Sequence, residues 1–204
     1  MRILLSSIAI AGSLLSVPVP AQQPTNRDAA LQAALEAHQH EFDYLLGDWS
    51  FVARNRQGGT FQGHWTAERL PGGQILDEFR VERPSGPHSV FTVRAYNAAL
   101  GRWDIVTLNR VAGLGHVGTA RKVGREIVAD QNVGSEDVHP SVWHIRYHDI
   151  TESHFLWDAD QSSDGGKTWD RDFMTIEAHR VGTSHVFGSL VPSDLPDKSP
   201  DTKQ

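Results

Sequence analysis

The stretch HSVFTVRAYN-AALG-RWDIVTLNR, residues 88–110, decides the fold class. Two runs rich in β-branched and aromatic residues flank a short connection that ends in glycine, which is the pattern of a β-hairpin. The pattern extends in both directions over residues 47–181, where Gly, Pro, Asn or Asp stands at nearly every joint between such runs. There are about ten runs, most of them roughly 7–10 residues long, and no helical period intervenes.

Short connections between consecutive strands produce an antiparallel meander. Ten up-and-down strands most simply close on themselves, because closure removes the exposed edges. The sequence therefore predicts an all-β domain over residues 47–181, an antiparallel up-and-down barrel of about ten strands. A barrel of that size is wide enough for its centre to stay unfilled by side chains.

A single helix is expected before the barrel, within residues 22–46. Asn26 can cap it and Asp28 suits its first turn. Gly47 ends the element. Apolar residues recur at helical spacing at Leu31, Leu35, Phe42 and Leu45. We therefore expect a helix from Asn26 to about Tyr44 that covers one mouth of the barrel.

The two ends of the chain differ from the barrel region in composition. Residues 1–21 combine a positive Arg2, an apolar run to Leu15 and small residues before a cleavage point after Ala21, the pattern of a signal peptide. The mature protein is then periplasmic or secreted, with no membrane insertion after cleavage. Residues 190–204 are rich in Pro, Ser, Asp and Lys, which predicts a disordered tail.

Composition restricts the partners and cofactors. The chain of 204 residues has a net charge of −6 and no basic block, which argues against nucleic acid as a partner. It has no cysteine, so disulfides and thiolate chemistry are excluded. His144 and His148 would lie about 13 Å apart on a strand, too far to share one zinc ion. We predict no metal site and no cofactor.

The octapeptide SSDGGKTW, Ser162–Trp169, matches the Asp-box pattern S-x-D-x-G-x-T-W of sialidase-type propellers. A propeller repeats such a unit in every blade, and this chain contains it once. A structural role is expected instead. Asp164 should accept hydrogen bonds from the turn, Gly165 and Gly166 should supply left-handed dihedrals, and Trp169 should pack back across the hairpin.

Several short motifs resemble those of a known family in their order and spacing. EFDYLLGDWSF, residues 41–51, resembles the F-D-x-x-x-G-x-W opening of a lipocalin-like (calycin-type) family of exported bacterial proteins of unknown function. The resemblance implies a closed barrel and no particular activity. The further matches are Gly63-x-Trp65, Leu70-x-Gly72-Gly73-x-x-x-Asp77, Arg94-x-Tyr96-Asn97, Trp103, Trp157 and Asp164–Trp169.

The same resemblance implies a role for Trp49 in the G-x-W position. In that architecture the tryptophan closes the barrel floor and meets an arginine of the last strand, for which Arg180 and Arg171 are the candidates. A looser similarity connects these barrels to haem-binding nitrobindin-like proteins. Their opening motif is more glycine-rich than GDWSFVARN of this chain.

Two orientations remain open at this point. Asp77 and Arg94 fall on neighbouring predicted strands, and they form either an inward pair that anchors a polar ligand head or an ordinary surface pair. On residues 143–148 alternate side chains share a face. Either Trp143, Ile145 and Tyr147 point inward, or His144, Arg146 and His148 do and line a wet pocket.

The functional hypothesis is a barrel of unknown physiological role that binds a small, partly apolar molecule in its interior. One alternative is an acid–base isomerase or lyase that uses the same cavity, with no catalytic residue assigned. The other is a nitrobindin-like haem protein with His144, His148 or His154 as axial ligand. The predicted ligand-binding residues are Trp65, Asp77, Arg94, Trp103, Trp143, Arg146 and Trp157.

Overall fold

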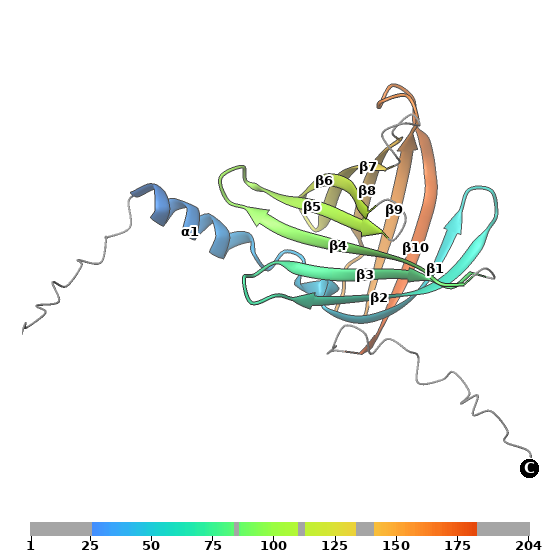
Figure 1. Cartoon of the computed structure of the whole chain (residues 1–204), viewed down its shortest axis with the longest axis horizontal. Helices are drawn as coiled ribbons and strands as arrows, with labels where there is room; N and C mark the ends of the chain where they lie inside the picture. The colour runs from blue at the N-terminus through green and yellow to red at the C-terminus, as the bar shows by residue number, and fades with distance from the viewer. Residues whose placement is uncertain (1–25, 84–85, 110–112, 134–140, 183–204) are drawn as a thin grey trace, which may run out of the picture.

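The computed structural model describes residues 26–83, 86–109, 113–133 and 141–182. The predicted signal peptide, residues 1–21, and the predicted tail, residues 190–204, lie outside these ranges. Ten antiparallel strands form a closed barrel in which each strand pairs with its neighbours in sequence and β1 pairs with β10 (Figure 1). The predicted up-and-down barrel is confirmed.

The strands follow the predicted runs closely, because turn residues mark their ends. Their bounds are β1 (Gly47–Asn55), β2 (Thr60–Arg69), β3 (Ile75–Val81), β4 (His88–Asn97), β5 (Arg102–Asn109), β6 (Gly113–Val123), β7 (Glu126–Val133), β8 (Ser141–His148), β9 (His154–Ser162) and β10 (Asp170–Gly182).

Inward and outward side chains alternate along the strands, as the pleat requires. On β8 the buried side chains are Ile145 and Tyr147, and Trp143 packs against the same core. Arg146 lies on the opposite face with 46% of its side chain exposed, beside Asp158 at 3.5 Å. The apolar set therefore faces the interior. The prediction that Arg146 lines the interior is wrong, because desolvating its charge there would need a buried partner.

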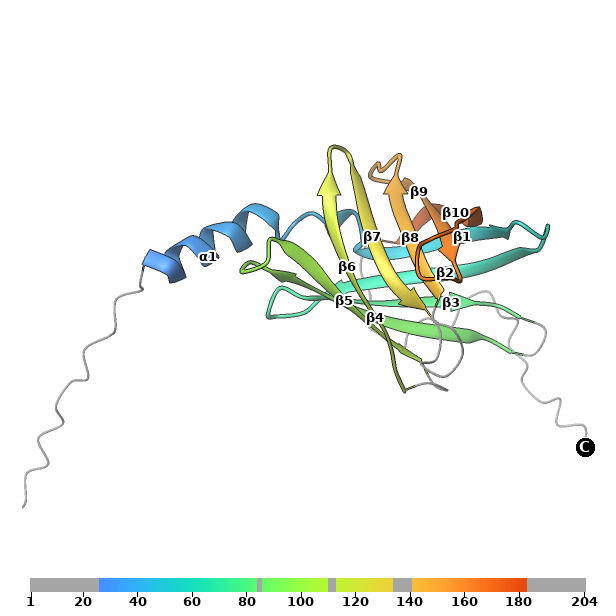
Figure 2. The ribbon, with the colours of Figure 1, turned by 90° about the horizontal axis from the view of Figure 1, so that it is seen from above.

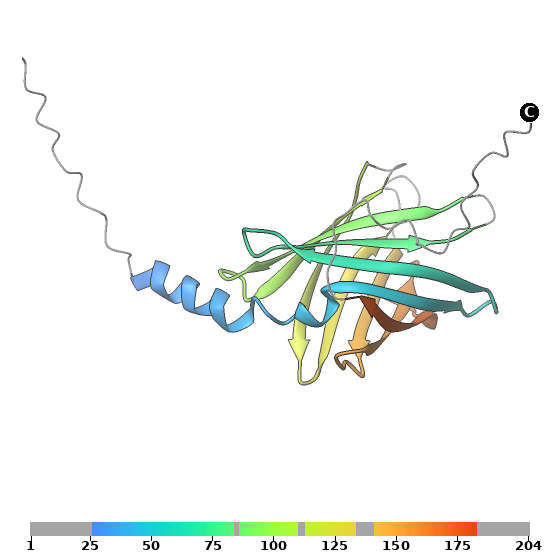
Figure 3. The ribbon, with the colours of Figure 1, turned by 90° about the horizontal axis from the view of Figure 1, so that it is seen from below.

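The helix differs from its prediction. Helix α1 spans Asn26–His38, has no buried residue and projects beside the barrel in all three views (Figure 1, Figure 2 and Figure 3). Its contact with the sheet includes His38 stacked on Tyr96 of β4, with ring centroids 5.0 Å apart. The expectation that this helix covers the barrel is wrong. Neither α1 nor the short turn after it, among the described residues, is long and apolar enough to cross a bilayer.

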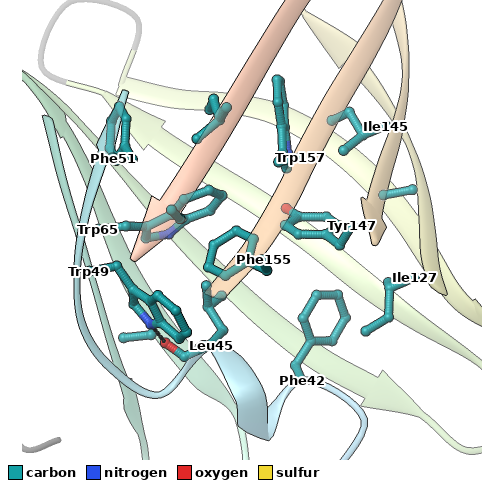
Figure 4. Packing of buried hydrophobic residues seen from close by; sticks show 14 of the residues in the cluster. Phe42, Leu45, Trp49, Phe51, Trp65, Ile127, Ile145, Tyr147, Phe155 and Trp157 are labelled. Carbon is teal, nitrogen blue, oxygen red and sulfur yellow. Dashed lines mark hydrogen bonds between the residues drawn. The ribbon is translucent and has the colours of Figure 1, made fainter. Parts of the chain in front are cut away.

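The segment after the helix closes the barrel instead. It contains the short 3-10 turn η1 (Asp43–Leu45), and Phe42 and Leu45 are both 0% exposed. Figure 4 shows these two side chains against the aromatic residues of the strands. The apolar residues assigned to one long helix therefore belong to two segments, and only the second one is buried.

Trp49 and Arg180 complete this closed end, which we call the floor. The indole Nε1 of Trp49 donates to the carbonyl of Leu45 at 2.9 Å, and the guanidinium of Arg180 lies 4.2 Å from the centre of the Trp49 ring. Arg180 also donates to the carbonyls of Tyr44 and Leu46. The predicted role of Trp49 is confirmed, and Arg180 is its partner on the last strand.

The octapeptide forms the connection between β9 and β10. Gly165 and Gly166 have φ values of 73° and 90°. The carboxylate of Asp164 accepts the backbone N–H groups of Lys167 and Thr168, both at 2.9 Å. Hydrogen bonds from Thr168, and then from Ser162, lower the pKa of Asp164 to about 2. The predicted hydrogen-bonded turn is confirmed.

Candidate ligand site

A cavity of about 290 Å³ occupies the end of the barrel opposite the floor. Arg83 and His88, which flank the connection between β3 and β4, line it, whereas the floor lies at the start of β1. The other lining residues described are Trp65, Phe79, Val90, Thr92, Arg94, Thr107, His116, Gln131, Trp143, Ile145, Tyr147, Trp157, Met174 and Ile176. Apolar walls with a few polar groups are typical of small-molecule sites.

A buried ion pair joins β3 and β4 beside this cavity. The Nε and Nη2 atoms of Arg94 donate to the two carboxylate oxygens of Asp77 at 2.7 and 3.1 Å. The indole of Trp65 donates to the same carboxylate at 2.7 Å. The side chains of Arg94 and Asp77 are 2% and 0% exposed. The orientation left open by the sequence is therefore inward for both residues.

Arg94 keeps its charge in this environment. Burial alone lowers the pKa of Arg94, but the charge of Asp77 and its hydrogen bonds raise that pKa above its usual value. The guanidinium lies 5.0 Å from the ring centre of Phe42 and 5.8 Å from that of Tyr147. Arg94 thus touches the floor with one side and lines the cavity with another.

Two buried donors at the cavity wall have no acceptor among the described residues. They are Nη1 of Arg94 and Nε1 of Trp143. A buried donor without a partner costs about 1–3 kcal/mol. A ligand oxygen that accepts from either nitrogen would remove the cost at that atom. The cavity therefore combines apolar walls with two lining residues whose buried donors have no hydrogen-bond acceptor among the described residues.

Two histidines of the cavity were missed by sequence reasoning. Burial lowers the pKa of both His88 and His116, and for His88 the nearby charge of Arg83 adds to the effect. Both shifts favour the neutral form of the ring. The signal for His116 was present in the sequence, since the inward alternation of β6 runs back from Ala120 through Gly118 to His116.

The predicted site residues divide into three groups. Trp65, Arg94, Trp143 and Trp157 line the cavity, and Asp77 lies behind Arg94. Trp103 and Arg146 do not line it. Trp103 belongs to the floor, where its indole donates to Glu41 at 3.0 Å and its ring meets Phe42 edge-on at 5.0 Å. The prediction of Trp103 as a pocket residue is wrong, because the segment before β1 covers that end.

The three histidines considered as haem ligands point away from the interior. His144 contacts Asp130 at 2.7 Å and His148 contacts Asp158 at 2.6 Å, both on the outer face. His154 lies on the outer face of β9, opposite His179. None of these three residues fits as the axial ligand of a haem inside the barrel.

No protein-family model and no curated protein matches this chain. Solved structures that resemble it include two β-barrels. A redesigned beta barrel has 15% identity and a TM-score of 0.41, with 70% of this chain and 96% of that chain covered. The structure of EF1p2_mFAP2b bound to DFHBI has 16% identity and a TM-score of 0.36, with 70% and 98% covered. Similarity at this level gives no argument about function, so the function has to be inferred from the chemistry of the cavity.

Proposed function

We propose that this chain is an exported lipocalin-like barrel that binds a small, partly apolar molecule through an oxygen acceptor. The observation that carries the proposal is the pair of buried donors, Nη1 of Arg94 and Nε1 of Trp143, at the wall of an otherwise aromatic cavity. Export rests on the predicted signal peptide of residues 1–21, and the proposed location is the periplasm or the outside of the cell.

The charge balance at Arg94 favours a neutral acceptor at that position. Asp77 already balances Arg94 at 2.7 Å, so a second carboxylate beside Asp77 would meet a like charge. A carbonyl or hydroxyl oxygen satisfies the donors without that repulsion. The volume of about 290 Å³ lies near the lower end of ligand pockets, which favours a compact aromatic or alicyclic molecule.

The state of Asp77 argues against an acid–base mechanism in which this carboxylate carries the proton. Its two carboxylate oxygens receive Arg94, and one of them also receives Trp65. A carboxylate held in this way is poorly placed to accept a proton from a substrate. We therefore assign Asp77 to the positioning of Arg94 rather than to proton transfer.

Matched probes test the proposal. We would titrate acetophenone and ethylbenzene, which differ mainly by a carbonyl oxygen, into ¹⁵N-labelled protein and follow the indole N–H signals of the six tryptophans. Acetophenone is expected to shift the Trp143 signal and to bind up to about tenfold more tightly than ethylbenzene, because one net hydrogen bond contributes about 0.5–1.5 kcal/mol. Equal affinities for the two probes would contradict the role of the acceptor.

Substitutions identify the site. Trp143→Phe keeps an aromatic ring and removes the donor. It should therefore lower the affinity for acetophenone and leave the affinity for ethylbenzene nearly unchanged. Met174→Trp should block both probes by filling the cavity that Met174 lines. Trp169→Phe, in the external turn beside Gly166, is the matched control and should change neither affinity. Binding of both probes by the Met174→Trp variant would place them outside the barrel.

A further inference from the structure

We propose a divalent metal site on the outer face of the barrel, formed by His154, Glu177 and His179. Each residue offers one ligand atom, and the three atoms lie within 4.8 Å of one another. The Oε1 atom of Glu177 is 3.3 Å from Nε2 of His179 and 3.8 Å from Nε2 of His154. One carboxylate oxygen thus faces two imidazole nitrogens.

Strand register brings these residues together. His154 of β9 lies directly opposite His179 of β10, and their ring centroids are 5.0 Å apart. Glu177 precedes His179 by two positions, so both side chains emerge on the same face. Beneath them Phe155 and Ala178 are 0% exposed, which anchors both strands in the core. The three ligands therefore stand on a rigid base and not on a loop.

The donor set fits zinc. Two imidazoles and a carboxylate are common zinc ligands at about 2.0–2.2 Å, and ligands of a tetrahedral ion at that distance are about 3.3–3.6 Å apart. The separation of Glu177 and His179 already has that value, whereas Nε2 of His154, 3.8 Å from Oε1 of Glu177, must move closer to bind the same ion. Three protein ligands leave a fourth position for water, as in catalytic zinc sites.

The surroundings leave the site accessible. The side chains of His154, Glu177 and His179 are 28%, 44% and 59% exposed, so an ion reaches them directly from solvent. Glu177 and His179 also line an outer groove of about 330 Å³ that includes His64 and Glu82. The other carboxylate oxygen of Glu177 lies 4.0 Å from Nη1 of Arg54, which leaves Oε1 available for a metal.

Spacing along the sequence does not reveal this cluster. The prediction of no metal site considered histidines on one strand, and the spacing argument holds for His144 and His148. His154 and His179 come from different strands, and only the pairing of β9 with β10 places them opposite each other. The site is independent of the proposed interior ligand, because it lies on the other face of the sheet.

Calorimetry with zinc chloride on the untagged, chelator-treated full chain tests the proposal. We expect one zinc ion per chain, with shifts of the imidazole signals of His154 and His179 in ¹⁵N spectra. His179→Gln and Glu177→Gln should each weaken zinc binding at least tenfold. Far-ultraviolet circular dichroism should show that both variants fold, because the two side chains are solvent-accessible and outside the core.

His144→Gln is the matched control. His144 also lies on the outer face beside a carboxylate, Asp130 at 2.7 Å, but no described residue completes a three-ligand cluster around it. Its substitution should leave zinc affinity unchanged. Absence of zinc binding at millimolar zinc, or undiminished binding by folded His179→Gln protein, would overturn the assignment.

Discussion

The two ends of the barrel are built from the same ten strands, yet one is filled and the other is hollow. At the floor, Phe42 and Leu45 come from the segment before β1 and pack among the inward rings of Trp49, Trp103 and Phe155. At the open end no described segment enters the barrel in this way. The ten strands alone therefore do not fill their own interior, and the segment that carries Phe42 and Leu45 makes one end solid.

The ion pair of Asp77 and Arg94 lies at the boundary between the two ends. Arg94 contacts Phe42 of the floor and also lines the cavity. Because the charge of Arg94 is buried, it needs a partner of opposite charge, and Asp77 supplies it. Asp77 therefore stabilises the fold and also orients Arg94 at the cavity. Substitution at this boundary is expected to destabilise the protein as strongly as substitution in the floor.

Asp77→Ala should destabilise the protein by about 3–5 kcal/mol, because it leaves the charge of Arg94 buried and unpaired. Urea denaturation followed by tryptophan fluorescence measures this loss. The double variant Asp77→Ala/Arg94→Met should lose less than the single variant, since no buried charge then remains. A double variant that loses more than Asp77→Ala alone would contradict this account of the pair.

A pair of phenylalanines compares the two ends directly. Phe155 is 0% exposed and meets Trp49 at 4.8 Å, so Phe155→Ala should cost about 3–5 kcal/mol. Phe79 lines the cavity and is only partly buried, so Phe79→Ala should cost roughly 1–2 kcal/mol. The difference between the two free energies of unfolding checks whether the open end is hollow. Equal losses would indicate that it is packed as tightly as the floor.

The smallest effect concerns pH at the open end. Because burial lowers the pKa of His116, the unfolded chain binds a proton more readily than the folded chain does. Stability is therefore fully present above the ordinary histidine pKa of about 6.5 and falls as the pH drops below it, until the folded form is protonated too. The urea midpoint should fall between pH 7 and pH 5.

His116→Gln should make that pH dependence shallower, since the glutamine does not titrate. The contribution of His116 to the free energy of unfolding should be smaller than the losses expected for Asp77→Ala and for the two phenylalanine substitutions, because the His116 side chain is only partly buried. If the slope is the same in the variant and the parent, the pH dependence arises from other groups, and the environment assigned to His116 is incorrect.

Much of the fold was predictable because its signals are local. The turn of Asp164, Gly165 and Gly166 depends on residues within five positions of one another, and its predicted hydrogen bonds and left-handed dihedrals are present. The strand runs and the pairing of neighbours follow from alternation and turn residues. The helix was predicted too long because Phe42 and Leu45 continue its apolar spacing. Spacing alone does not distinguish the apolar face of a helix from a segment that closes the barrel.

The candidate site was predictable only in part. Alternation places Arg94 and Asp77 on definite faces, but burial decides which face is the inner one, as the outward Arg146 shows. Trp103 points inward but lies at the floor, where its indole donates to Glu41. His116 had a readable signal in the alternation of β6. The opposition of His154 and His179 had none, because it depends on the register between two strands.

The amino-acid sequence by itself determined the ten strands, their turns and the antiparallel order, since these depend on residue types over a few positions. Only the tertiary structure decided that Phe42 and Leu45 close one end, that Asp77 and Arg94 are buried together, and that a cavity remains at the other end. The physical reason is that burial and cross-strand contact are properties of the closed barrel, in which residues distant along the chain share one interior.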